Sequence, residues 1–92
     1  MPHESAADRA LRMINAYRNA FREEYGQAFY DHMQIWWEHG WFYLWHPYQY
    51  PDGRWGMASD RPYAMRGNQI EALTETLKQR KGVIHSDATD SR

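Results

Sequence analysis

The stretch from Trp36 to Trp55, WWEHGWFYLWHPYQYPDGRW, decides how this chain folds. Its twenty residues carry all five tryptophans and nine of the fifteen aromatic side chains of the protein. A buried aromatic side chain removes about 150–250 Å² from water, so these rings must supply much of the hydrophobic core. Nine rings nevertheless exceed the needs of one small core. We therefore expect several of them to remain partly exposed.

The composition of the whole chain makes these rings more important still. Its 92 residues suffice for one domain, and they include only four isoleucines, four leucines and one valine. Without cysteine the chain has no disulfide or thiolate ligand, which for a small domain favours a cytoplasmic location. No apolar run is long enough to cross a membrane, and the first residues do not follow a signal-peptide pattern. The net charge of −1 argues weakly against a general nucleic-acid binder.

An amphipathic helix is predicted ahead of the aromatic stretch. Ser5 followed by Asp8 is typical of a helix N-cap with an acidic first turn. The apolar side chains then recur at three- and four-residue steps, which places them on one helical face: Ala10, Ile14, Tyr17, Phe21 and Tyr25. Gly26 leaves open whether the helix breaks there or continues to Gly40. In a continuous helix residues 28–37 would be apolar nearly all round, which predicts burial on two sides.

The remainder of the aromatic stretch predicts a β-hairpin. Residues 41–45 are short and aromatic, as expected of a strand, and residues 50–53 (Tyr-Pro-Asp-Gly) form a strong turn signal. Residues 54–58 would return as the second strand. Pro47 restricts the first strand to a sheet edge or shortens it. Residues 59–67 are predicted to form a turn followed by a linker.

A second helix is predicted near the C-terminus, with Asn68 as its cap and Gly82 as its end. Its apolar edge is narrow and consists of Ile70, Leu73 and Leu77. The predicted fold is therefore α+β: a long N-terminal helix, an aromatic β-hairpin and a C-terminal helix in a single small domain. The domain would span residues 1–84, and residues 85–92 would form a disordered polar tail.

No catalytic or metal-binding constellation is found. His32, His39 and His46 are spaced seven apart, and on a helix that spacing separates neighbours by about 10.5 Å, too far for one metal ion. Residues 85–87 (His-Ser-Asp) contain the residue types of a hydrolase triad, but neighbours in a polar tail do not have its geometry. We expect a protein that is not an enzyme and that holds no metal or cofactor. The histidines would lie at the rim of the aromatic core.

Protein binding is the favoured function. Tryptophan, tyrosine, methionine and arginine are enriched at interfaces, and this chain is rich in all four. The second face of the long helix or the outward rings and free edge of the hairpin would bind another protein or a second copy of the chain. Such a module would act as a small regulator, inhibitor or adaptor, a class that includes the inhibitors of phages and mobile elements. The residues predicted to bind protein are Tyr30, Met33, Trp37, Trp41, Tyr43 and Trp55.

Single-stranded nucleic acid is the alternative ligand. Rings beside arginines can stack on bases and hold phosphates, with about 1–3 kcal/mol for each stacked base. The same neighbours can instead form cation–π pairs within the protein. The residues that would bind nucleic acid are Arg54, Trp55, Arg61, Tyr63 and Arg66.

Overall fold

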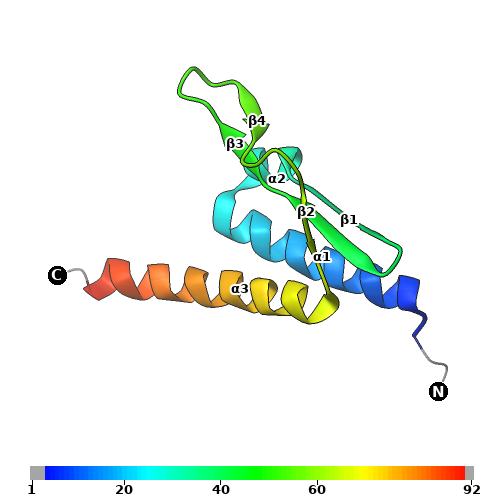
Figure 1. Cartoon of the computed structure of the whole chain (residues 1–92). Coiled ribbons are helices and arrows are strands. Elements are labelled where there is room, and N and C mark those ends of the chain that lie inside the picture. Colours follow the sequence, from blue (N-terminus) through cyan, green and yellow to red (C-terminus); the bar gives the residue numbers. More distant parts are fainter. Residues whose placement is uncertain (1–3, 91–92) are drawn as a thin grey trace.

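Two long helices lie side by side and pack on one face of a small antiparallel sheet, the α+β architecture that the sequence predicts (Figure 1). The computed structural model describes residues 4–90, with side chains described for residues 4–80. The elements in chain order are α1 (Ala6–Tyr25), α2 (Gln27–His32), β1 (Gln34–Glu38), β2 (Trp41–Trp45), β3 (Pro47–Gln49), β4 (Trp55–Met57), β5 (Tyr63–Met65) and α3 (Gly67–Asp90).

The first helix begins and ends at local signals. The Ser5 hydroxyl accepts a hydrogen bond from the Asp8 amide at 3.0 Å, which confirms the predicted N-cap. At the other end the backbone of Gly26 has φ +94°, a conformation that side-chain-bearing residues rarely adopt. The helix therefore stops at Tyr25, and the chain changes direction before α2.

Of the two alternatives left open at Gly26, the break is observed, and the helix that continues to Gly40 is wrong. α2 has only six residues, and after it the chain extends into β1 at residues 34–38. His39 (φ 53°) and Gly40 (φ 83°) are both left-handed, as the two-residue turn of a β-hairpin requires. This turn pairs β1 with β2, placing Trp36 opposite Tyr43. Cross-strand pairing thus outweighs the helical periodicity that the apolar residues of this segment also fit.

The predicted hairpin is also paired differently. Residues 55–57 do form a strand, but β4 pairs with β3 and not with β2. The predicted turn between them is confirmed, since the Gly53 amide donates to the Tyr50 carbonyl at 2.9 Å and Gly53 has φ +94°. Both edges of β2 are occupied, by β1 and by β5, a strand within the predicted linker. The β3–β4 hairpin consequently projects from the body as a separate arm (Figure 1).

The C-terminal helix starts at Gly67, one residue before the predicted cap. The Gln69 side-chain oxygen accepts from the Arg66 amide at 2.8 Å and so caps the first turn. α3 extends to Asp90, past the predicted end at Gly82. Residues 85–90 of the predicted polar tail therefore belong to this helix, and their side chains lie outside the described part of the chain.

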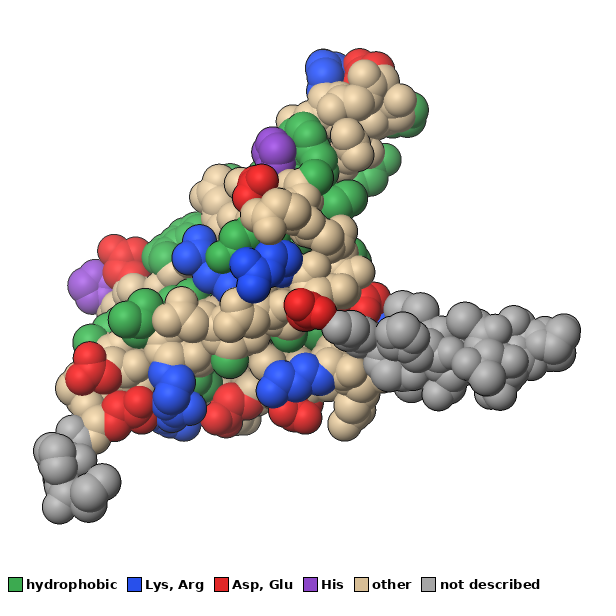
Figure 2. All heavy atoms as spheres, turned by 180° about the vertical axis from the view of Figure 1, so that it is seen from behind, with side chains coloured by type: hydrophobic (Ala, Val, Ile, Leu, Met, Phe, Trp, Pro, Cys, Tyr) green, Lys and Arg blue, Asp and Glu red, His purple; other side chains and the backbone are tan. Residues whose placement is uncertain are grey.

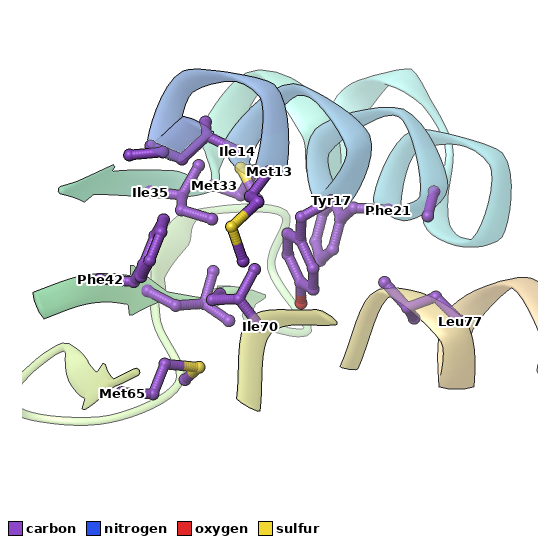
Figure 3. Close-up of a cluster of buried hydrophobic side chains, with 13 residues drawn as sticks. Met13, Ile14, Tyr17, Phe21, Met33, Ile35, Phe42, Met65, Ile70 and Leu77 are labelled. Carbon is purple, nitrogen blue, oxygen red and sulfur yellow. The ribbon is translucent and has the colours of Figure 1, made fainter. Parts of the chain in front are cut away.

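The core fills the space between the helices and the inner face of the sheet (Figure 3). α1 contributes Tyr17 and Phe21, β2 contributes Leu44, and α3 contributes Ile70, and all four are almost completely buried. None of the five tryptophans is fully buried. The expectation that aromatic rings would be left over at the surface is confirmed.

One histidine lies at the rim of this core. His46 Nε2 is 3.3 Å from the Tyr17 hydroxyl, and its ring centroid is 5.4 Å from that of Phe21. Burial disfavours the charged imidazolium and lowers the pKa of His46 below its ordinary value. The same burial raises the pKa of Tyr17, whose phenol stays neutral.

We expect the depressed pKa of His46 to make the domain sensitive to acid. The unfolded chain takes up this proton near pH 6.5, about the ordinary histidine value, whereas the folded imidazole takes it up only at lower pH. The unfolded state therefore binds more protons in this window, and stability is lost as pH falls from about 6.5 through the folded pKa. Urea unfolding at a series of pH values measures the slope.

Two variants identify the histidine responsible for that slope. His46→Gln should flatten it, because the titrating group is gone. His39→Asn is the matched control, because the His39 side chain is 87% exposed and asparagine tolerates its positive φ. Equal slopes in the wild type and His46→Gln would contradict the assignment.

Candidate functional site: an aromatic sheet face

The alternation of β2 sorts its side chains between the two faces of the sheet. Phe42 and Leu44 point to the helices and are buried. Trp41, Tyr43 and Trp45 point to the opposite face, because successive side chains of a strand alternate. Both long helices pack against the inner face, so neither covers these three rings (Figure 1).

β1 adds a fourth ring to the outer face. Trp36 is opposite Tyr43 in the antiparallel register, and their ring centroids lie 5.4 Å apart with 20° between the planes. Offset stacking of this kind stabilises a ring pair by about 0.5–1.5 kcal/mol beyond its buried area. We define the aromatic sheet face as Trp36, Trp41, Tyr43 and Trp45.

Polar contacts hold two of these rings in place. The Arg66 guanidinium lies 3.8 Å from the Trp41 ring centroid, and its Nη1 donates to the Gly40 carbonyl at 2.9 Å. The Trp45 indole N–H donates to the Ser59 carbonyl at 2.9 Å. These contacts leave little freedom in the rings, so the face is ordered before any ligand arrives. A pre-ordered surface loses less entropy on binding.

The structure separates the residues that the sequence grouped for protein binding. Trp41, with 36% of its surface exposed, and the half-buried Tyr43 both lie on the aromatic sheet face. Trp55 does not, because it belongs to β4. Its ring stacks on His32 at 4.1 Å and meets the edge of Phe29 at 4.9 Å. Trp55 thus joins the β3–β4 arm to α2.

The predicted second face of the long helix does not exist. Met33 is buried in the core, since the chain turns inward and becomes extended there. Trp37 is opposite Phe42, so it points toward the helices and packs partly buried against the core. Tyr30 is half-buried on α2 beneath Arg22, whose guanidinium is 5.1 Å from its ring centroid. The end of α2 at His32 separates these side chains, because Tyr30 belongs to the helix whereas Met33 and Trp37 lie in the extended chain that follows.

The residues predicted to bind nucleic acid are not brought together either. Arg54 Nε is 2.7 Å from the Asp52 carboxylate, and its guanidinium lies over Tyr50. Arg66 lies over Trp41 instead of beside Tyr63. The remaining residues of this set are dispersed, with Trp55 on β4 and the exposed Arg61 and Tyr63 at the β5 end of the sheet. The alternative prediction, cation–π pairing within the protein, is observed for both arginines. Arg54 lies over Tyr50, and Arg66 lies over Trp41.

Sequence reasoning missed Trp36 and Trp45 as site residues. Strict alternation from Trp41 places Trp45 on the same face as Trp41 and Tyr43, so that signal was present. Trp36 has no such signal, because it joins the face only through the pairing of β1 with β2.

Other chemistry has little support elsewhere in the described part of the chain. No group of three histidine, aspartate or glutamate side chains in it could hold a metal ion. Its helices include none that is long and apolar enough to cross a membrane. A hollow of about 490 Å³ lies between α1 and α3, and Glu23 and Lys78 are the charged residues of its lining. Seen from behind, acidic and basic side chains are intermixed along the lower half of the molecule (Figure 2).

No protein-family model, curated protein or solved structure matches this chain, so its function is inferred from the site itself.

Proposed function

We propose that this domain is a non-catalytic module that binds another protein on its aromatic sheet face. One observation supports this proposal above all: four aromatic rings lie together on a face of the sheet that neither long helix covers. Tryptophan and tyrosine are the residues most enriched at binding hot spots, which cluster near the centre of an interface. The predicted roles of regulator, inhibitor or adaptor and the predicted cytoplasmic location belong to this proposal.

The chemistry of the face indicates the kind of partner. The Trp45 N–H already has an acceptor, and the Arg66 guanidinium already covers part of Trp41. The face therefore offers flat ring surface and few free donors. An apolar patch on another folded protein fits this surface. Charged side chains around that patch would complement Glu38 and Arg66, which lie at one end of the sheet.

Single-stranded nucleic acid has less support. Phosphate binding needs free cations beside the stacking rings. The arginine next to Trp55 is engaged by Asp52, and Trp55 itself is stacked on His32. No described observation favours nucleic acid over protein.

The proposal is tested by affinity capture from the native host with matched variants. Trp41→Ala and Tyr43→Ala remove rings from the face, whereas Tyr48→Ala removes an exposed ring from the β3–β4 arm. We expect a captured protein to be lost with the first two variants and kept with the third. Calorimetry with the identified partner should show about 30-fold or greater weakening for Trp41→Ala, as expected of a hot-spot residue.

The same experiment can contradict the proposal. Equal capture by wild type and both face variants would place the binding surface elsewhere. Quenching of tryptophan fluorescence by a single-stranded oligonucleotide, reversed by salt, would identify nucleic acid as the ligand instead.

A further inference from the structure

The free edge of β1 is suited to pairing with another strand. β1 lies at the edge of the three-stranded sheet and has five residues, none of them proline. The left-handed turn makes Glu38 and Trp41 a hydrogen-bonded pair, and alternation then directs the N–H and C=O groups of Ile35 and Trp37 away from β2. No other described strand pairs with this edge. The opposite edge, β5, has only three residues and follows Pro62.

An apolar strip of α1 runs beside this edge. Leu11 is 58% exposed, more than any other large hydrophobic side chain among the described residues. A shallow groove of about 300 Å³ separates the strip from β1. Its helix side is lined by Ala7, Leu11, Ile14 and Arg18, and its strand side by Ile35, Trp36 and Trp37. A strand paired with β1 would extend over this groove.

The charges along the same strip are not balanced within the chain. Arg18 Nε is buried without a hydrogen-bond partner, and its guanidinium has only the Tyr30 ring at 5.9 Å. A buried donor without an acceptor is costly, so a carboxylate brought to this point would be favoured. The ion pairs of residues 4–80 include neither Arg18 nor Asp8, which lies ten residues earlier on α1.

We propose that a second copy of this chain pairs with β1 about a two-fold axis through Trp36. Ile35 of each copy then faces Trp37 of the other, and these are the residues whose backbone groups are free. Trp36 meets its own counterpart, and the two sheets become one of six strands. A self-complementary contact of this kind is how two-fold dimers form.

The same rotation brings the unbalanced charges together. The N-terminal part of α1 lies near the end of β1, where Ala10 lines a hollow with Trp37 and Gly40, and Arg18 lies near Tyr30, which precedes β1. The two-fold axis therefore places α1 antiparallel to its counterpart. Leu11 is then near the axis. Helical side chains lean toward the N-terminus, so Arg18 of one copy reaches Asp8 of the other, on both sides of the axis. Each copy thus supplies the carboxylate that the Arg18 of the other lacks.

This dimer does not depend on the proposed function. It uses the β1 edge and α1, whereas the partner protein would bind the aromatic sheet face. Trp36 is the one residue at the junction of the two surfaces. Trp41→Ala should weaken partner binding and leave the dimer intact, so the two proposals can fail separately.

Sedimentation equilibrium and amide hydrogen exchange test the pairing. We expect monomer and dimer to be in equilibrium at protein concentrations below about 1 mM. Even a dimer with a Kd of about 1 mM is half formed at that protein concentration. Exchange at the Ile35 and Trp37 amides should slow as the protein concentration rises. The Ala64 amide, on the free edge of β5, should show no such change. A monomer throughout, or concentration-dependent protection at Ala64 instead, would overturn the proposal.

A charge exchange tests the helix contact. Asp8→Arg and Arg18→Asp should each weaken self-association about tenfold or more, because both symmetric pairs become repulsive. An equimolar mixture of the two variants should dimerise again, since one chain then carries both arginines and the other both aspartates. Leu11→Asp should give monomers, whereas Leu73→Asp, at an exposed leucine of α3, should not. Dimers that tolerate Leu11→Asp and gain nothing from mixing would overturn this geometry.

Discussion

Leu44→Asp is expected to unfold the domain, whereas Tyr43→Asp, one position earlier, is expected to leave it folded. Leu44 is 1% exposed at the centre of the sheet, so the new carboxylate would be buried without a partner. A lone buried charge costs about 3–5 kcal/mol or more. That cost is comparable to the whole stability of a typical small domain, about 5–15 kcal/mol.

Tyr43→Asp has a different consequence because its side chain points to the outer face. The substitution removes the stack with Trp36, at a cost of about 1 kcal/mol, and it places the carboxylate in water. Circular dichroism and urea unfolding of the two variants measure the contrast. The folded Tyr43→Asp variant should also lose the captured partner. If Leu44→Asp stayed folded and Tyr43→Asp did not, the two faces of β2 would have to be exchanged.

Phe21→Ala is expected to lower the free energy of unfolding by about 3–5 kcal/mol, the usual cost of a buried ring and the cavity that replaces it. Phe21 is 1% exposed, and its ring centroid lies 4.6 Å from that of Tyr25 and 5.4 Å from that of His46. Urea unfolding followed by far-ultraviolet circular dichroism gives the difference directly.

Tyr25→Ala is the matched control for this substitution. Tyr25 lies one turn later on the same helix, but it is 39% exposed, and its hydroxyl accepts from Arg80 at the surface. We expect about 1 kcal/mol for its removal, the typical cost of a point substitution. Equal costs for the two variants would mean that Phe21 is not a core ring.

Local signals in the sequence predicted the parts of the fold that depend on local interactions. The cap at Ser5, the spacing of the apolar residues to Phe21 and the turn at residues 50–53 all involve residues within a few positions of one another. Each was confirmed at or near the predicted position. The α+β class followed from these elements alone.

The pairing of the strands could not be predicted in the same way. Residues 28–37 fit a helical stripe, and only the contact of β1 with β2 makes residues 34–38 a strand. The turn that joins them, His39-Gly40, lacks the Asn-Gly or Asp-Gly pair that usually marks a hairpin. β5 is three residues long and has too short a pattern to recognise.

The candidate site was predicted in part for the same reason. Trp41 and Tyr43 belong to the strand that the sequence identified. Trp36 required the position of β1, and Met33 was assigned to the surface because a helix was assumed. Which of the surplus rings lie outside depends on strand register, and register is not a local property.

The place of α3 in the chain has a consequence for how the molecule is made. Hairpins close through short loops and form early, whereas Tyr25 meets Arg80 across 55 positions. During synthesis the hairpins leave the ribosome before Ile70 and Leu77 of α3. Tyr17 and Phe21 therefore emerge before the helix that packs against them. We therefore expect the nascent polypeptide to expose this apolar surface to water until α3 has been translated.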